Sequence, residues 1–334
     1  MRALVIGAAG FVGAYLLRHL QQELGYTVAA TKLPGEQLRE AWADRSENKR
    51  GGPDAVVDWY DLDILNPEAV LELFRKVRPD HIFHLAAQSS VAAAWKYPGL
   101  TVDVNIHGTV NVLEALRELE WKPRLLLIGS GEEYGRPGPR EIPVREEHRL
   151  EPGNVYAATK ACQNMLGRIY AEAYGLEVVM VRAFNHIGPN QEPLFVAADF
   201  CRQAALIEAG RKEAVIRVGN LDVRRDFTDV RDVVRAYAML AERGAAGETY
   251  NVGSGRAVRI ADMLQMIVKR AEADIRIEQD TERMRPADVS VMAADILKLQ
   301  KVTGWEPRIC LEQTIAETLD YWRGRVLAEK FFDG

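Results

Sequence analysis

Residues 3–13 read ALVIGAAGFVG, an apolar run that leads into three closely spaced glycines. The run is typical of a buried β-strand, and the glycines stand where a helix would begin. A glycine first in the series permits a tight turn, the second lets the backbone approach a pyrophosphate, and the third allows close helix packing. The alternative is a glycine-rich turn that only packs. We predict a dinucleotide-binding turn with cofactor contacts at Gly7, Gly10, Phe11, Val12 and Gly13.

The same alternation of apolar runs and helix-length segments continues through the first half of the chain. The further runs are 27–31, 55–63, 81–87, 124–130 and 176–185, and the predicted helices are 11–24, 67–77, 101–119 and 155–174. Continuous apolar strands separated by helices indicate a parallel sheet covered on both faces. The sequence therefore predicts an α/β fold: a doubly wound (Rossmann) parallel sheet with a smaller mixed C-terminal lobe that binds the substrate.

We place the domain boundary after the sixth strand. Residues 1–185 are the predicted NAD(P)-binding domain, and 186–330 are mainly the substrate-binding lobe. Residues 221–255 partly rejoin the first domain, because the strand-like TYNVG at 249–253 suits the same sheet. The polar segment 34–54 is expected to be a surface excursion.

Composition narrows the class of protein. The 334 residues carry a net charge of −5, which disfavours a general nucleic-acid surface. No apolar stretch approaches the roughly 20 residues that cross a membrane, and the N-terminus lacks a secretory leader. The three widely spaced cysteines suit a reducing compartment, so we expect a cytoplasmic protein. No metal site is predicted.

The second strand bears on the choice of cofactor. It ends in Thr31 and Lys32 instead of an acidic residue, and a carboxylate there would accept hydrogen bonds from a free ribose but repel a 2′-phosphate. We therefore favour NADP(H) over NAD(H), although Lys32 as a solvated loop charge is the alternative. Further expected cofactor contacts are Asp63, for the adenine amino group, and Ile64, both after the third strand; a turn or N-cap role is the alternative for Asp63. Ala86 and Ala87 after the fourth strand leave room for a cofactor, with packing as the alternative.

Three residues are candidates for proton and hydride chemistry. Tyr156 and Lys160 are four positions apart on a helix and so share one face. A nearby ammonium is expected to lower the pKa of a tyrosine and make it useful in acid–base catalysis. Ser130 ends the fifth strand, where its hydroxyl can bind the same reacting oxygen. Asn105 is expected to steady this helix or a proton-relay water near the cofactor.

The motifs GAAGFVG, HLAAQSSV, VNIHGTVNVLEA, IGSGEEYG, YAATK and RAFNHIGP together resemble the extended short-chain dehydrogenase/reductase family over nearly the whole chain. Within it, GSGEEYG, FNHIGP, RRDFTDVRDVV and MRPADV are most similar to the enzymes that reduce GDP-4-keto-6-deoxy-D-mannose to GDP-D-rhamnose. The resemblance implies a GDP-sugar substrate gripped by the C-terminal lobe, and a homodimer in which the helices at 101–119 and 155–174 form a four-helix contact.

Substrate contacts follow from the same resemblance. The matched positions for the diphosphate are Arg225 and Arg285, and arginine suits phosphate because its planar fork binds two oxygens; surface ion pairs are the alternative. The other matched positions are Asp288 for ribose hydroxyls, Asn185 for a substrate-contacting amide, Asp199 for the guanine and Ser89 for the hexose, with capping of the next helix as the alternative for Ser89.

The expected reaction is NAD(P)H-dependent reduction of the sugar's 4-keto group, with Tyr156 as the proton donor. Glu132 matches the carboxylate that acts at sugar carbon 5 in dehydratase relatives, so GDP-mannose 4,6-dehydratase or another nucleotide-sugar dehydratase or epimerase is the alternative. A non-catalytic dinucleotide-sensing protein is a third reading, which the intact set of Ser130, Tyr156 and Lys160 disfavours.

Overall fold

The computed structural model describes residues 1–38, 57–280 and 290–329. Two predicted substrate contacts, Arg285 and Asp288, lie outside these residues, as does most of the polar segment 34–54.

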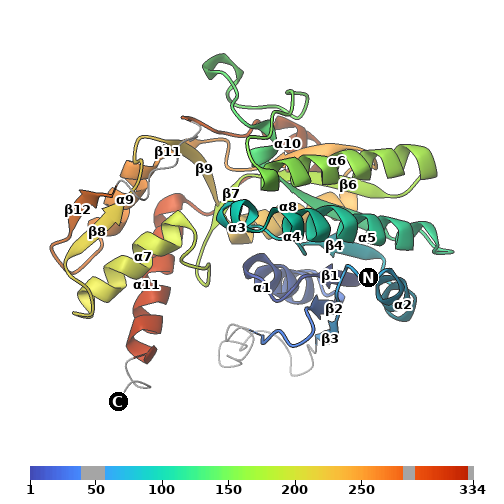
Figure 1. The fold of residues 1–334 in the computed structure, drawn as a ribbon, viewed down its shortest axis with the longest axis horizontal. Coiled ribbons are helices and arrows are strands. Elements are labelled where there is room, and N and C mark those ends of the chain that lie inside the picture. Colours follow the sequence, from blue (N-terminus) through green and yellow to red (C-terminus); the bar gives the residue numbers. More distant parts are fainter. Residues whose placement is uncertain (39–56, 281–289, 330–334) are drawn as a thin grey trace.

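A seven-stranded parallel sheet forms the centre of the molecule (Figure 1). Its order is β10-β6-β5-β4-β1-β2-β3, which extends the doubly wound order by one strand at the β6 edge. The strands are β1 (Arg2–Ile6), β2 (Thr27–Lys32), β3 (Asp58–Asp61), β4 (His81–His84), β5 (Arg124–Ser130), β6 (Val178–Ala183) and β10 (Thr249–Val252). The predicted fold class is confirmed, and the run at 249–253 does join this sheet, where β10 pairs with β6.

Helices cover both faces of this sheet because successive side chains of each strand point to opposite sides. Ala3 and Val5 pack against one set of helices, and Leu4 and Ile6 pack against the other. The first set is α1 (Phe11–Arg18), α8 (Val230–Arg243) and α10 (Leu297–Thr303); the second is α2 (Pro67–Val77), α5 (Gly108–Arg117) and α6 (Val155–Tyr174).

Two predicted helices are interrupted by wider turns. The helix predicted at 11–24 continues from α1 into a π-helical turn, η1 (His19–Glu23). The helix predicted at 101–119 consists of α4 (Pro98–Val102), a π-helical turn η4 (Asp103–His107) and α5. A short helix, α3 (Val91–Lys96), precedes α4. Turns of this kind often occur at functional sites, and η4 contains Asn105.

A second group of elements lies beside the sheet and has its own apolar cluster. It contains a three-stranded sheet, β11-β9-β7, and a two-stranded sheet, β12-β8. Its strands are β7 (Asn185–Ile187), β8 (Val215–Val218), β9 (Arg224–Asp229), β11 (Ala257–Arg259) and β12 (Arg276–Gln279), and its helices are α7 (Val196–Glu208), α9 (Ile260–Val268) and α11 (Leu311–Glu329).

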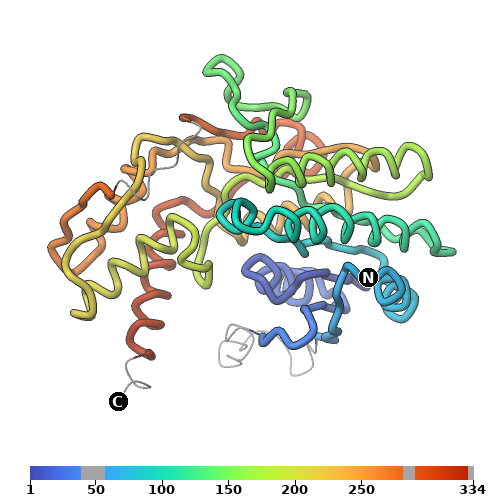
Figure 2. Tube along the Cα trace, in the orientation of Figure 1, coloured from blue at the N-terminus to red at the C-terminus, as the bar shows by residue number. Residues whose placement is uncertain are grey.

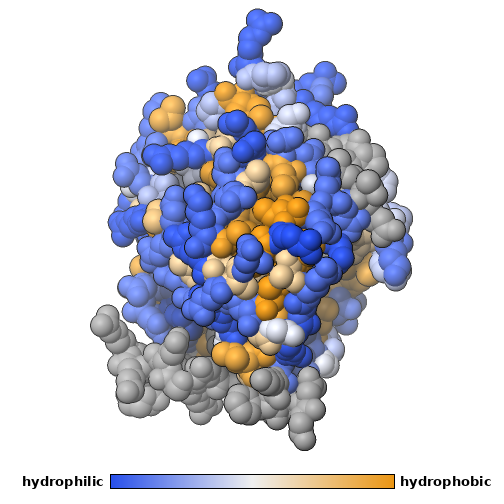
Figure 3. Space-filling view, turned by 90° about the vertical axis from the view of Figure 1, so that its left-hand side faces the viewer, coloured by the Kyte–Doolittle hydropathy of each residue, from blue (hydrophilic) through white to orange (hydrophobic). Residues whose placement is uncertain are grey.

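The chain crosses between the main sheet and this second group more than once (Figure 2). On the outer face of the second group, hydrophobic side chains form a band between charged and polar ones (Figure 3). Within the described residues, no helix is both long and apolar enough to cross a membrane.

Candidate active site

The turn between β1 and α1 is shaped by its glycines. Gly7 has a φ of +79°, and a Cβ there would lie 2.6 Å from the Cα of Ala86. A Cβ on Gly13 would lie 2.1 Å from the carbonyl oxygen of Ala8, so only glycine lets the helix pack this closely. At Gly10 a Cβ would meet only the carbonyl oxygen of Gly7, at 3.8 Å. The backbone at Gly10 is therefore open to a ligand, as a pyrophosphate requires, while Gly7 and Gly13 serve the fold.

Thr31 and Lys32 have different surroundings at the end of β2. Thr31 is buried, and its hydroxyl accepts a hydrogen bond from the amide of Gly7 at 3.0 Å. It therefore supports the glycine turn. Lys32 is one-fifth exposed, and its ammonium lies 2.6 Å from the carboxylate of Asp61 on β3.

The predicted adenine contacts lie between β3 and α2. Asp63 is exposed, and its carboxylate accepts a hydrogen bond from the amide of Leu65 at 2.9 Å, which is a turn contact. Ile64 is buried, and its carbonyl accepts from the side chain of Asn111 on α5 at 2.9 Å. Ala87 is half-buried just after β4.

Ser130, Tyr156 and Lys160 come together at the carboxyl end of β5. Ser130 is the last residue of the strand, and its side chain lies close enough to the phenol of Tyr156 to influence its pKa. Asn154 caps α6 by accepting from the amide of Ala157 at 2.8 Å, which fixes the helix start next to Tyr156. One turn further on, the Lys160 ammonium donates to the carbonyl of Ile128 at 2.8 Å.

The protonation of this group differs from the prediction in one respect. Burial raises the pKa of Tyr156 to about 12, the charges of Glu132 and Glu133 add to the rise, and the nearby Ser130 hydroxyl opposes it. Burial also lowers the pKa of Lys160 to about 8. The predicted lowering of the tyrosine pKa by Lys160 is therefore wrong for this structure, because burial and two carboxylates dominate.

Glu132 borders the same group. It is half-buried, its amide donates to the Ser130 hydroxyl at 3.2 Å, and the side-chain amide of Asn154 lies 3.5 Å from its carboxylate. A carboxylate thus stands beside the tyrosine, as the dehydratase alternative would need.

Sequence reasoning missed the next residue, Glu133. It is fully buried, accepts from the backbone amide of Ser130 at 2.7 Å, and pairs with the guanidinium of Arg182 on β6 at 2.9 Å. A serine followed three positions later by glutamate is the pattern of a capping box, and that pattern is formed here by Ser130 and Glu133. The spacing was the available signal.

Asn105 joins two parts of the site. Its side-chain oxygen accepts from the amide of Gln88 at 2.8 Å, and its nitrogen donates to the Thr159 hydroxyl at 2.9 Å. Asn105 is completely buried. It therefore ties the loop after β4 to α6, next to Lys160.

The predicted substrate contacts are spread over several elements. Ser89 is exposed, and the residue that caps α3 is Ser90, so the capping alternative for Ser89 is wrong. Asn185 is exposed at the start of β7. Asp199 on α7 accepts from the side chain of Gln203 at 2.9 Å, and Arg225 on β9 is half-buried.

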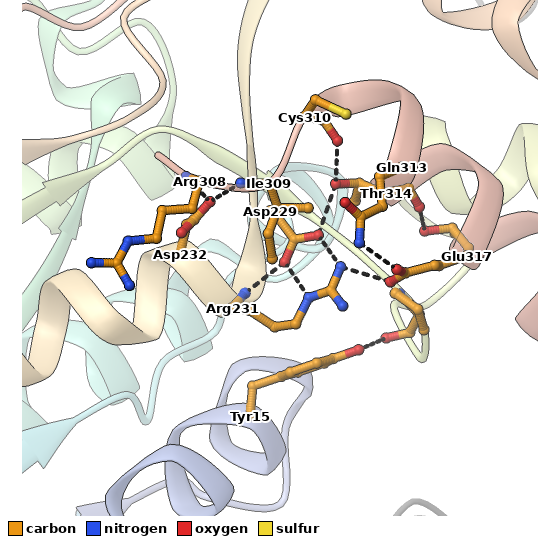
Figure 4. Close-up of polar contacts among 12 residues, drawn as sticks. Tyr15, Asp229, Arg231, Asp232, Arg308, Ile309, Cys310, Gln313, Thr314 and Glu317 are labelled. Atoms are coloured by element: carbon orange, nitrogen blue, oxygen red, sulfur yellow. Dashed lines mark hydrogen bonds and ion pairs between the residues drawn. The ribbon is translucent and has the colours of Figure 1, made fainter. Parts of the chain in front are cut away.

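Polar contacts join α1, the helix that follows the glycine turn, to the second group of elements (Figure 4). The Tyr15 hydroxyl of α1 donates to the carbonyl of Pro189 at 2.9 Å. Close by, Asp229 at the end of β9 is buried and lies 2.7 Å from the guanidinium of Arg231. Arg231 also pairs with Glu317 of α11 at 2.6 Å. These contacts fix the part of the molecule that follows β7 against the glycine turn.

A glycine turn on a doubly wound sheet, with serine, tyrosine and lysine at the end of β5, defines an NAD(P)-dependent oxidoreductase of the extended short-chain dehydrogenase/reductase type. The family model described as GDP-mannose 4,6 dehydratase matches residues 4–318. The chain belongs to this family.

Individual relatives agree with this assignment. The chain is 35% identical to GDP-6-deoxy-D-mannose reductase of Pseudomonas aeruginosa, over 98% of this chain and 99% of the relative. It is 28% identical to GDP-mannose 4,6-dehydratase of Yersinia enterocolitica, over 95% and 92%.

Solved structures give the same picture. RMD from Pseudomonas aeruginosa, complexed with NADPH, superposes with a TM-score of 0.83 at 32% identity and covers 97% of this chain and 99% of its own. UDP-glucose 4-epimerase of Thermus thermophilus, in complex with NAD, also gives a TM-score of 0.83, at 29% identity over 97% and 99%. The chain is therefore an NAD(P)-dependent enzyme related to nucleotide-sugar reductases, dehydratases and epimerases.

Proposed function

We propose that the enzyme reduces the 4-keto group of GDP-4-keto-6-deoxy-D-mannose and forms GDP-D-rhamnose. The observation that carries this proposal is the similarity to GDP-6-deoxy-D-mannose reductase, which is 35% identical over 98% of this chain. The phenol of Tyr156 lies near Ser130 at the carboxyl end of β5, and a tyrosine with a raised pKa is protonated at neutral pH, as a proton donor must be. A dehydratase would use the same serine, tyrosine and lysine, so these residues alone do not separate the two reactions.

In this reaction the bound nicotinamide cofactor supplies a hydride to carbon 4. Tyr156 donates its proton to the carbonyl oxygen, which becomes the new hydroxyl, and Ser130 orients that oxygen through its own hydroxyl. Lys160 contributes its ammonium beside the cofactor ribose. Reduction of one ketone consumes one hydride and one proton, so one reduced cofactor is oxidised per product.

NADP(H) is the proposed cofactor, with NAD(H) as the alternative. Lys32 is the predicted residue that offers a positive charge to a 2′-phosphate, although it shares that charge with Asp61. The RMD structure named above is complexed with NADPH, whereas the epimerase is in complex with NAD. The open backbone at Gly10 fits the pyrophosphate of either cofactor.

For the substrate, we propose that residues 186–330 bind the GDP-sugar and residues 1–185 bind the cofactor, with 221–255 divided between them. The proposed substrate contacts keep the roles given by the family resemblance: Ser89, Glu132, Asn185, Asp199, Arg225, Arg285 and Asp288.

We also propose a homodimer through the helices at 101–119 and 155–174. On α6, Met165 and Ile169 are 59% and 50% exposed, and Leu100 of α4 is 53% exposed. Large exposed apolar side chains on neighbouring helices suit a subunit contact. A cytoplasmic location is proposed because Cys162, Cys201 and Cys310 are all free thiols.

The cofactor content of the purified enzyme separates the proposal from its alternative. A dehydratase or epimerase recycles its cofactor and is expected to retain it through purification. We expect the denatured protein to release little NADP, and turnover to oxidise one NADPH per product. Stoichiometric bound NADP, together with turnover that consumes no added NADPH, would contradict the reductase and favour a dehydratase that uses Glu132.

A further inference from the structure

Glu133 has no assigned role, yet it lies directly behind the serine of the site. One carboxylate oxygen accepts from the Ser130 backbone amide at 2.7 Å, and the other accepts from the Arg182 guanidinium at 2.9 Å. Burial raises the pKa of Glu133, and Arg182 and the Ser130 amide oppose the rise. Both oxygens accept from N–H donors, which is the geometry of an ionised carboxylate. The side chain is fully buried.

The strand before it leaves room for this carboxylate. A Cβ on Gly129 would lie 2.3 Å from the Glu133 carboxylate and 2.6 Å from the carbonyl oxygen of Val181. Any other residue at position 129 would displace the carboxylate or the strand. The end of β5 therefore packs closely against the Glu133 carboxylate, and the hydrogen bond to the Ser130 amide fixes the position of Ser130.

The partner of Glu133 is itself held in place. The Arg182 guanidinium donates to the Tyr134 hydroxyl at 3.0 Å and to the carbonyl of Glu146 at 2.9 Å. Tyr134 in turn donates to the side chain of Asn251 on β10 at 2.7 Å. The ion pair is thus anchored to two strands of the main sheet, which fixes the position of the charge.

That charge lies on the same short stretch of backbone as the Lys160 ammonium. Lys160 donates to the carbonyl of Ile128 at 2.8 Å, and Glu133 accepts from the amide of Ser130, two residues further on, at 2.7 Å. In agreement with this, Glu133 raises the pKa of Lys160 against the effect of burial, and it raises the pKa of Tyr156. The other groups that face this pair are Glu132, which also raises the pKa of Tyr156, the phenol of Tyr237 on α8, and His84 on β4, whose pKa burial lowers to about 3. Among these groups, Glu133 supplies the negative charge opposite Lys160.

We infer that Glu133 is a positioning residue of the reductive site: it fixes Ser130 through the backbone amide and places a negative charge opposite the Lys160 ammonium. This role rests on the proposed function, in which a protonated Lys160 holds the cofactor and Ser130 orients the keto oxygen.

The test compares E133Q with E177Q. Glu177 pairs with Arg124 at 2.7 Å at the opposite end of β5 and β6, so E177Q also removes a Glu–Arg pair from the same two strands. NADPH binding is measured by fluorescence over a pH series, and kcat and KM for the keto sugar are measured alongside. NADPH binding is expected to weaken as the pH rises and Lys160 loses its proton. In E133Q we expect the midpoint of this loss to lie roughly one pH unit below that of the wild type. We also expect a kcat reduced by at least about tenfold, with little change in KM. E177Q should behave as the wild type.

A purely structural role predicts a different result. E133Q would then lose activity equally at every pH, with an unshifted binding profile, and that outcome would overturn the inference. If E133Q does not fold because Arg182 is left unpaired, the double variant E133Q/R182M removes both charges and is expected to show a smaller shift in the same direction. Wild-type protein that binds NADPH but does not reduce the keto sugar would contradict the proposed function alone, because the binding profile still tests Glu133.

Discussion

Lys32 at the end of β2 and Asp61 at the end of β3 form an ion pair, with the ammonium 2.6 Å from the carboxylate. The Lys32 ammonium, which we propose binds the 2′-phosphate, is therefore already paired with a carboxylate. We expect K32A to weaken NADPH binding about 10- to 100-fold, because a charge-assisted hydrogen bond contributes about 1.5–3 kcal/mol, and to leave NADH binding nearly unchanged. D61N should tighten NADPH binding, since it removes a nearby negative charge. Fluorescence titration with both cofactors measures this, and equal weakening of both by K32A would rule out the proposed contact.

Tyr156 and Ser130 lie near each other at the end of β5 and are expected to have separable roles. Without the phenol, no proton reaches the carbonyl oxygen, so Y156F should reduce kcat by roughly 10²- to 10⁴-fold while NADPH still binds. S130A should keep a larger share of activity, because the proton donor remains. Steady-state kinetics and NADPH titration on the same preparations check both expectations. Parallel loss of turnover and cofactor binding in Y156F would instead indicate a structural role.

Lys160 sets the expected pH dependence. Its pKa is lowered to about 8, whereas that of Tyr156 is raised to about 12. The protonated lysine is present below about pH 8 and is lost above it, while the tyrosine stays protonated. We therefore expect kcat/KM for NADPH to be level below about pH 8 and to fall above it. K160R should remove this fall because arginine keeps its charge, at a lower kcat; a K160R profile that falls at the same pH would assign the fall to another group.

The polar junction in Figure 4 is expected to contribute to stability. The hydroxyl of Thr314, on α11, donates to the buried carboxylate of Asp229 at 2.7 Å. T314V keeps the side-chain volume but removes this donor, so unfolding should become easier by about 1.5–3 kcal/mol. E317Q removes the more exposed partner of Arg231 and should cost less than about 1 kcal/mol. Urea unfolding measures the free energy of unfolding of both variants. Equal losses in T314V and E317Q would show that the burial of Asp229 does not determine how much each contact stabilises the fold.

The main sheet could be predicted from the sequence because its signals are local. Apolar runs and helical periods appear within single segments, and the three glycines follow the first apolar run directly. Gly7 is confined by Ala86 from the end of a distant strand, whereas the contact of Gly13 with Ala8 is local too. The same holds for the helix that carries Tyr156 and Lys160, which begins and ends at 155 and 174 as predicted.

Side-chain pairs between segments that are distant in the sequence could not be predicted in the same way. Lys32 meets Asp61 only because β2 and β3 are adjacent in the sheet, and Glu133 meets Arg182 across β5 and β6. The raised pKa of Tyr156 depends on burial together with the charges of Glu132 and Glu133, so the spacing of Tyr156 and Lys160 alone led to the wrong direction. The contact between Glu133 and Ser130 could have been predicted, because the serine–glutamate spacing of a capping box is visible in the sequence.

The central claim is tested most directly by two incubations of the purified enzyme. One contains GDP-4-keto-6-deoxy-D-mannose and NADPH, and the other contains GDP-mannose alone; nucleotide absorbance and the product's configuration at carbon 4 are measured in both. We predict NADPH oxidation with formation of GDP-D-rhamnose in the first and no conversion in the second. No NADPH oxidation in the first, with conversion of GDP-mannose in the second, would contradict the reductase.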